Sequence, residues 1–296
     1  MATRDLVIGI IFFIQTIFGI LGNFCLLYHY LFFYLTGSRL RSTDLILKHL
    51  TVANLSVILS KGVFQTMLAL GLKDFLNDIG CKLVFYVHRT SRNVSIGITC
   101  LLSVFQAITI SPLNSMWAEL KAEAPKYMGA SNIFCWVLNV MLNILVLFYM
   151  TEKESNINIT RKRDYGYCSS ITHGDNTESL YVVLFLFYDG FCLGFMICSS
   201  GSMVFILYRH NQRVQHMRKK NLSPRSSPEI RATQSILVLV CTFVCSWTLS
   251  SVFHICLVVF NNPSLWLVNT STLLAACFPS VSPYILMRHD SRISGL

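Results

Sequence analysis

The chain has 296 residues, of which 53% are hydrophobic and only 13% are charged, and its formal net charge is +10. Phenylalanine alone occurs 21 times. A soluble domain does not need so much apolar material, so the composition indicates a membrane protein before any motif is considered. The positive charge does not indicate a nucleic-acid-binding protein, because the basic residues flank long apolar runs and leave no room for a recognition fold.

Seven apolar stretches follow one another along the chain. Each is long enough to cross a hydrocarbon layer of about 30 Å, which takes roughly 20 helical residues. The predicted spans cover about residues 6–35, 50–72, 83–110, 129–151, 180–208, 236–260 and 265–287. The turn signal Asn261-Asn262-Pro263 separates the last two, since proline cannot continue a helix. We therefore expect an all-α membrane protein, in which residues 1–296 form a single seven-transmembrane helix bundle.

Lysine and arginine in the connections predict the orientation, because cationic segments remain in the cytoplasm. The connection between the fifth and sixth spans is the most basic. Its cations are Arg209, Arg213, Arg218, Lys219, Lys220, Arg225 and Arg231, against the single acid Glu229. The fourth connection mixes acids with bases and suits the exterior. We expect an extracellular amino terminus, a cytoplasmic carboxyl terminus and contact between the basic connection and anionic membrane lipid.

Two features of the fourth connection suit an exterior position. Cys168 lies within this connection and Cys81 opens the third span at its outer end, so both face an oxidising compartment. We predict a disulfide between them; the alternative is two free thiols. The sequon Asn158-Ile159-Thr160 lies in the same connection, which makes Asn158 the predicted glycosylation site.

A few ionisable residues lie within the predicted spans, where a charge is costly unless it faces the bundle interior, water or a partner. They are Lys61 in the second span, His88, Arg89 and Arg92 in the third, Asp189 in the fifth and His254 in the sixth. Positions 88, 89 and 92 crowd one side of a helix, and Arg89 lies about 12 Å from the outer end by helical rise. We predict an exterior-facing cavity in which these six residues are the candidate ligand-binding groups.

Two interpretations of the buried cations stay open at this stage. In the first, the guanidinium groups of Arg89 and Arg92 bind a polar or anionic part of a small, largely apolar ligand, because guanidinium pairs well with carboxylate, sulfate or phosphate oxygens. In the second, Asp189 and acids of the fourth connection neutralise the cations, or Lys61 and Arg92 extend toward other polar groups. His254 taken alone is more typical of a hydrogen-bonded interior residue.

Several long strings of residues carry a family resemblance. They lie at 48–55 (KHLTVANL), 103–112 (SVFQAITISP), 201–210 (GSMVFILYRH), 223–229 (SPRSSPE) and 231–240 (RATQSILVLV). Together with Gly22-Asn23 and Ser282-Pro283-Tyr284 they closely resemble vomeronasal type-1 pheromone receptors over the whole chain. The resemblance implies rhodopsin-like architecture and a G-protein-coupled chemoreceptor of the plasma membrane. Such a receptor detects pheromones or other small semiochemicals and activates an inhibitory-class G protein.

Transduction must use the inner face that the basic connection predicts, where the candidate G-protein-facing residues are Arg209, Arg213, Arg218 and Arg231. This basic segment either contacts the G protein or only holds anionic lipid, and both interpretations stay open. The wider rhodopsin-like pattern is incomplete, since the third span ends without Asp-Arg-Tyr and the seventh lacks Asn-Pro-x-x-Tyr. The standard ionic-lock account of activation therefore does not transfer to this chain.

Competing classes of function receive little support from the sequence. Metalloprotease, phosphate-cradling and paired-aspartate protease motifs do not occur, so we expect neither an enzyme nor a cofactor or metal site. A bitter-taste-like receptor is the nearest alternative. A small-solute transporter is more remote, because the two halves show no repeat and no matching broken helices.

Overall fold

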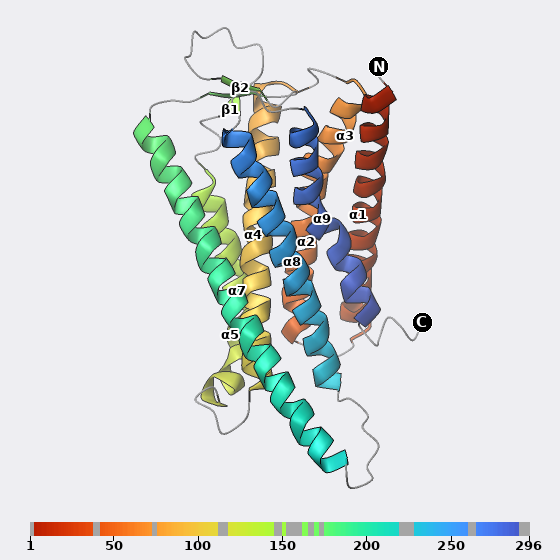
Figure 1. The fold of residues 1–296 in the computed structure, drawn as a ribbon, viewed down its shortest axis with the longest axis vertical. Coiled ribbons are helices and arrows are strands. Elements are labelled where there is room, and N and C mark those ends of the chain that lie inside the picture. The colour runs from red at the N-terminus through yellow and green to blue at the C-terminus, as the bar shows by residue number, and fades with distance from the viewer. Residues whose placement is uncertain are drawn as a thin grey trace.

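The computed structural model describes residues 3–37, 42–72, 76–111, 118–144, 150–151, 162–164, 169–171, 175–218, 228–259 and 265–289. Six long helices are α1 (Thr3–Leu35), α4 (Asp78–Ile110), α5 (Ala118–Leu142), α7 (Asp175–Arg218), α8 (Pro228–Val259) and α9 (Leu265–His289). The seventh rod is continuous and consists of α2 (Ser42–Val57), the π-helical turn η1 (Ile58–Gly62) and α3 (Val63–Ala69). Within the described ranges these rods pack side by side (Figure 1), so the predicted seven-helix bundle is confirmed.

Four of these helices contain apolar windows long enough to cross a membrane within the described part of the chain. The windows are Val7–Leu35, Ile79–Ile110, Leu186–Arg209 and Asn269–Arg288, and α8 adds the shorter apolar segment Ile236–Ser250. The second rod and α5 carry more polar side chains, many of them buried inside the bundle. Hydropathy alone therefore marks these two rods less strongly than it marks their neighbours.

A small antiparallel sheet accompanies the bundle and was not predicted. Its strands β1 (Met150–Thr151), β3 (Ser169–Ile171) and β2 (Lys162–Asp164) lie side by side in that order. The predicted fourth span reached residue 151, whereas α5 ends at Leu142 and Met150 belongs to a strand. The boundary was wrong because a short apolar run does not distinguish a helix from a strand.

Several helices also extend beyond the predicted spans. The α5 helix begins at Ala118 rather than near 129, and α7 runs from Asp175 to Arg218 rather than from 180 to 208. The physical reason is that hydropathy reports the lipid-buried part of a helix, whereas the helix continues through polar residues that favour helical backbone. The start of α1 and the sheet lie at one end of the bundle, and the end of α7 and the start of α8 at the other (Figure 1).

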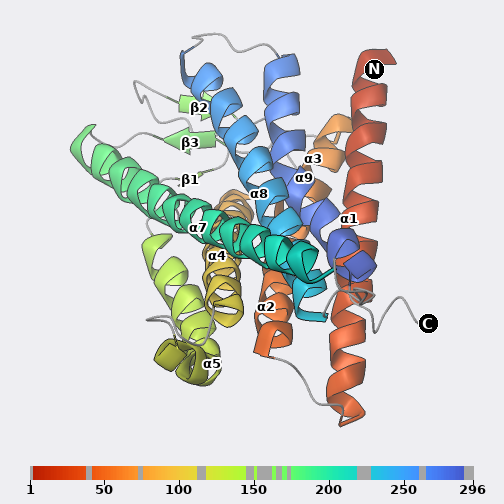
Figure 2. The ribbon, with the colours of Figure 1, turned by 60° about the horizontal axis from the view of Figure 1, so that its bottom comes forward.

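The central helix of the bundle is α4. Within the protein, 72% of its apolar window is buried, against 33% for α1 and 22% for α7. It packs against α2, α5, α7 and α8, and both views show it between α5 and α2 with α7 crossing nearby (Figure 1, Figure 2). Polar residues of the third span therefore lie in the interior, where they meet partners from several helices.

Buried amide side chains connect helices that are distant in sequence. The Nδ2 of Asn23 in α1 donates to the backbone oxygen of Pro279 in α9 at 2.9 Å. Asn54 in α2 accepts from Ser95 Oγ of α4 at 2.7 Å and donates to Ser282 Oγ of α9 at 2.9 Å. Hydrogen bonds of this kind stabilise packed membrane helices by about 0.6 kcal/mol each on average. Asn54 thus holds α2, α4 and α9 together.

A second polar junction joins α4, α5 and α7 around Tyr188. Its hydroxyl accepts from Asn139 Nδ2 at 2.9 Å and donates to the Asn93 backbone oxygen at 3.2 Å. The Cys135 thiol lies 4.0 Å from the same hydroxyl. Gly97 faces this junction, and a β-carbon built there collides with the Tyr188 hydroxyl and approaches Cys135 Sγ to 2.6 Å. Only glycine leaves room for the tyrosine at this crossing.

We expect Gly97→Ala to destabilise the protein by about 1–3 kcal/mol, the usual cost of overpacking a filled interior. Thermal unfolding of the purified protein in lipid nanodiscs measures the loss. In the background of Tyr188→Phe with Cys135→Ala, which removes both colliding atoms, the same substitution should cost far less. Gly190→Ala is the matched control, because an added β-carbon there meets nothing within 4 Å. Equal losses at positions 97 and 190 would contradict this packing account.

Candidate ligand-binding site

A π-helical turn shapes the second rod where it passes α4. The Val63 backbone N–H bonds to the carbonyl of Ile58, five residues back, instead of the usual four. The Val57 carbonyl just before this turn accepts a hydrogen bond from Ser60 Oγ at 3.2 Å. The same turn carries Lys61, which lines one cavity together with His88 of α4.

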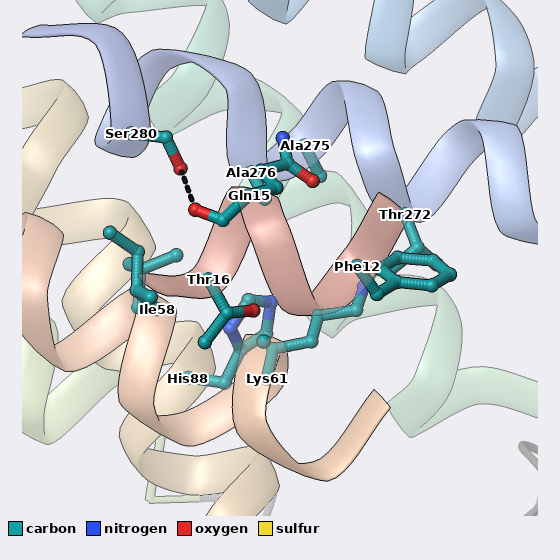
Figure 3. A pocket seen from close by; sticks show the side chains of 12 residues that line it. Phe12, Gln15, Thr16, Ile58, Lys61, His88, Thr272, Ala275, Ala276 and Ser280 are labelled. Carbon is teal, nitrogen blue, oxygen red and sulfur yellow. Dashed lines mark hydrogen bonds between the residues drawn. The ribbon is translucent and has the colours of Figure 1, made fainter. Parts of the chain in front are cut away.

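The first cavity lies between α1, η1, α4 and α9 and has a volume of about 20 Å³. Lys61 and His88 form part of its wall, and Figure 3 shows the Lys61 side chain extending toward Phe12 while His88 lies near Thr16. The opposite wall comes from α9, where Ser280 Oγ donates to the Gln15 backbone oxygen at 3.5 Å. The cavity is thus mostly apolar, with a basic group on one side.

The second cavity lies between α4, α8 and α9 and has a volume of about 40 Å³. Its lining residues from these helices and from the end of α2 are Val57, Arg92, Ser95, Phe243, Ser246, Trp247, Ser250, Leu274, Ala275, Phe278 and Pro279. Val57 and Ala275 line both cavities, so these two residues form the wall between them. About 10–15 Å³ accommodates one water molecule, so a larger ligand requires side chains of this wall to move.

Charged groups around the two cavities interact with one another. Asp189 of α7 is half-buried and attracts the guanidinium groups of Arg92 and Arg89. Lys61 lies within electrostatic reach of the same two arginines and is repelled by them. Among the described residues, Lys61, Arg89, Arg92 and Asp189 therefore lie close enough to influence one another electrostatically. Asp189 supplies part of the internal neutralisation that the second interpretation of the sequence requires.

The structure brings together five of the six candidate ligand-binding residues. Lys61 and His88 line the first cavity, Arg92 lines the second, and Arg89 and Asp189 interact with Arg92. His254 lies in α8, and its side chain is outside the part that the structure describes.

The structure describes only some of the predicted functional residues that lie outside the cavities. Cys81 is fully buried at the start of α4 and is disulfide-bonded, whereas Cys168 and Asn158 lie outside the described residues. Arg209 is exposed on α7, with its guanidinium carbon 5.6 Å from the centre of the Phe205 ring. The helices α7 and α8 contain the other three candidate G-protein-facing residues, Arg213, Arg218 and Arg231, whose side chains are not described.

Sequence reasoning missed the contribution of α8 to the second cavity. Positions 243, 246, 247 and 250 follow helical spacing and lie on one face, and two of them are the hydroxyl residues Ser246 and Ser250. Small hydroxyl residues one turn apart within an apolar span were the available signal. The signal was weak because serine in a membrane helix often bonds only its own backbone.

Comparison with known proteins decides the family. Residues 6–296 match the vomeronasal organ pheromone receptor family. The chain is 56% identical to human vomeronasal type-1 receptor 3 over 298 residues, which cover 100% of this chain and 95% of that protein. It is 54% identical to human vomeronasal type-1 receptor 4, with 99% and 97% covered. The chain belongs to the vomeronasal type-1 receptor family.

The family match confirms the resemblance inferred from the sequence strings, and similarity extends to a more distant relative. Olfactory receptor class A-like protein 1 of Danio rerio is 29% identical over 286 residues, which cover 96% of this chain and 90% of that protein. Vomeronasal type-1 receptors are G-protein-coupled chemoreceptors, so the protein is a multi-pass membrane receptor whose partners are a small-molecule ligand and a G protein.

The attraction between Asp189 and Arg92 can be tested with a double-mutant cycle. We expect Asp189→Asn and Arg92→Gln to be non-additive in unfolding free energy by about 0.5–3 kcal/mol, because each removes the same attraction. Thermal unfolding of the two single variants and the double variant measures the coupling. Asp189→Asn combined with Lys126→Gln is the control, since Lys126 is exposed on α5 and pairs with Glu123 at 2.7 Å. Additivity in both pairs would show that Asp189 and Arg92 do not interact.

Proposed function

We propose that this receptor binds small, largely apolar semiochemicals inside the helix bundle and activates an inhibitory-class G protein. The observation that carries the proposal is the meeting of Lys61, His88, Arg92 and Asp189 around two interior cavities in a member of a chemoreceptor family. Charged groups persist in a membrane interior only where partners compensate them, and such groups mark functional sites by default.

The polar or anionic part of the ligand meets the cationic side of the interior, chiefly Arg89 and Arg92. Asp189 attracts both guanidinium groups, which supports internal neutralisation. Asp189 is one carboxylate, however, whereas Arg92 and Lys61 are two buried cations, and burying uncompensated charge is costly. An anionic or strongly accepting ligand group therefore completes the charge balance that Asp189 begins.

The receptor is a single seven-span domain of the plasma membrane, with its amino terminus outside and its carboxyl terminus inside. The start of α1 and the sheet share one end of the bundle, while the basic ends of α7 and α8 share the other (Figure 1). The Lys and Arg content of the α7–α8 connection favours the cytoplasm for that second end. At the exterior end, the disulfide of Cys81 is with Cys168, and Asn158 carries the glycan.

Signalling uses the inner ends of α7 and α8. A ligand shifts the bundle only by its differential affinity for two arrangements, so it must bind one packing of α8 better than another. The favoured arrangement opens a groove that admits a helix of the G protein. Arg209, Arg213, Arg218 and Arg231 flank that groove and contact the G protein or anionic lipid.

The function is tested by nucleotide exchange on a purified inhibitory-class G protein, with the receptor in nanodiscs and a panel of odorant carboxylic acids paired with their methyl esters. Arg89→Gln and Arg92→Gln should each lower potency for acids by about 10–150-fold, the range for a lost charge-assisted hydrogen bond of about 1.5–3 kcal/mol. Their effect on the esters should be smaller. Equal losses for acids and esters would refute anion recognition.

Two controls separate this receptor function from its competitors. Arg209→Gln should leave the ratio of acid to ester potency unchanged, because Arg209 is exposed far along α7. Agonist-dependent exchange on a stimulatory-class G protein alone would overturn the inhibitory assignment. Ligand uptake into sealed vesicles without any exchange would favour the transporter class instead.

The orientation has its own test. An epitope tag inserted near residue 160 should bind antibody on intact cells, while a tag at residue 220 should bind only after permeabilisation, because the arginine-rich connection stays in the cytoplasm. The reverse labelling pattern would invert the receptor. Surface expression of both tagged chains, measured after permeabilisation with a shared carboxyl-terminal tag, controls for delivery.

A further inference from the structure

We infer that the second cavity is the subsite that selects the ligand's hydrogen-bond-accepting oxygen, with Ser250 of α8 and Arg92 of α4 as its donors. The inference rests on the proposed function that a small molecule binds inside the bundle, and it names the chemistry of that molecule. The expected ligand is an apolar body that carries a carbonyl or carboxylate oxygen. Arg92 disfavours an ammonium group at this position, because two cations repel each other.

The first observation is the buried hydroxyl group of Ser250. Its side chain is 2% exposed, and its Oγ has no hydrogen-bond partner in the part of the chain that the structure describes. Native proteins seldom leave a buried hydroxyl unsatisfied, because the group has lost its hydrogen bonds to water. Since Ser250 lines the second cavity, a ligand oxygen placed there supplies the missing partner.

Some of the other polar groups that line this cavity already donate a hydrogen bond within the protein, and others can donate one to a ligand. Ser95 also lines the cavity, but its Oγ already donates to Asn54 Oδ1 at 2.7 Å. Arg92 offers donors only and has no acceptor, so it discriminates in favour of accepting oxygens. Ser246 lies one helical turn from Ser250 on the same wall. Donors from α4 and α8 therefore line one shared space of about 40 Å³.

The remaining walls of the cavity are aromatic, which suits the apolar body of a ligand, and they include a contact between α8 and α9. Phe243 of α8 and Phe278 of α9 line the cavity and contact each other edge to face, with ring centroids 4.6 Å apart and an interplanar angle of 89°. Trp247 lies on the same face of α8. A ligand in this cavity thus touches the aromatic contact between α8 and α9. The first cavity, with Lys61 and His88, offers no comparable contact with α8 among its lining residues.

The test labels Ser250→Cys in the full-length receptor in nanodiscs. Two methanethiosulfonate reagents of similar size are compared, one with a sulfonate and one with a trimethylammonium group, and modification is quantified by peptide-resolved mass spectrometry. Each rate is divided by the rate of the same reagent with 2-mercaptoethanol. We expect Ser250→Cys to react, with a normalised preference for the anionic reagent of about fivefold or more, because the nearby guanidinium attracts it.

Three comparisons make the result specific. Adding Arg92→Gln should reduce the preference to about one, since the attracting charge is gone. Leu249→Cys is the matched control at the same depth, because Leu249 is 50% exposed on the outer face of α8. It should show no anionic preference. Ser246→Cys is the second probe of the same wall and replaces Ser250→Cys if that variant does not fold.

Equal normalised rates for the two reagents, a preference that survives Arg92→Gln, or no modification at either serine position would overturn the subsite. Labelling does not depend on signalling, so its failure is distinguishable from failure of the proposed function. Anion-selective labelling without nucleotide exchange would count against the receptor function. Exchange without selective labelling would count against Ser250 and Arg92 as the acceptor-binding donors.

Discussion

The hydrocarbon interior does not solvate polar groups, and this constraint organises the whole receptor. A polar side chain within a span must find a partner in its own helix backbone, as exposed Thr242 and Thr248 do, or turn inward toward another helix or a cavity. The α4 helix carries many such residues, and its apolar window is the most buried of the four long apolar windows among the described residues. Its polar residues form hydrogen bonds with Asn54 of α2 and Tyr188 of α7, and Asn54 in turn donates to Ser282 of α9. The packing of the bundle follows from satisfying these groups.

The same constraint produces the site. Cations that cannot face lipid gather in the interior, where Asp189 is the nearby acid that attracts Arg92 and Arg89. Tyr188 precedes Asp189 in α7, and its hydroxyl bonds the backbone of Asn93, the residue after Arg92. The junction that packs α4 against α7 therefore also sets where the acid meets the guanidinium. The packing of α4 against α7 and the pairing of Asp189 with the arginines therefore depend on the same contact region.

In the proposed function, the α8 helix links the ligand site to the inner face. It contributes Ser250, Trp247 and Phe243 to the second cavity and begins at Pro228, at the opposite end of the bundle from the sheet. A rigid helix transmits a displacement along its length, so a change at the Phe243–Phe278 contact reaches the arginine-rich end. Recognition and signalling then share one helix without requiring the motifs that this chain lacks.

The sequence by itself determined the class, the seven spans in outline and the family, since hydropathy, charge placement and long residue strings are properties of the linear chain. It also identified Lys61, His88, Arg92 and Asp189, because ionisable residues in apolar runs are conspicuous. Only the tertiary structure decided that α5 ends at Leu142, that Met150 lies in a strand and that Ser250 lines the second cavity. Which face of a helix meets which neighbour depends on packing between segments remote in sequence, and local composition does not encode that packing.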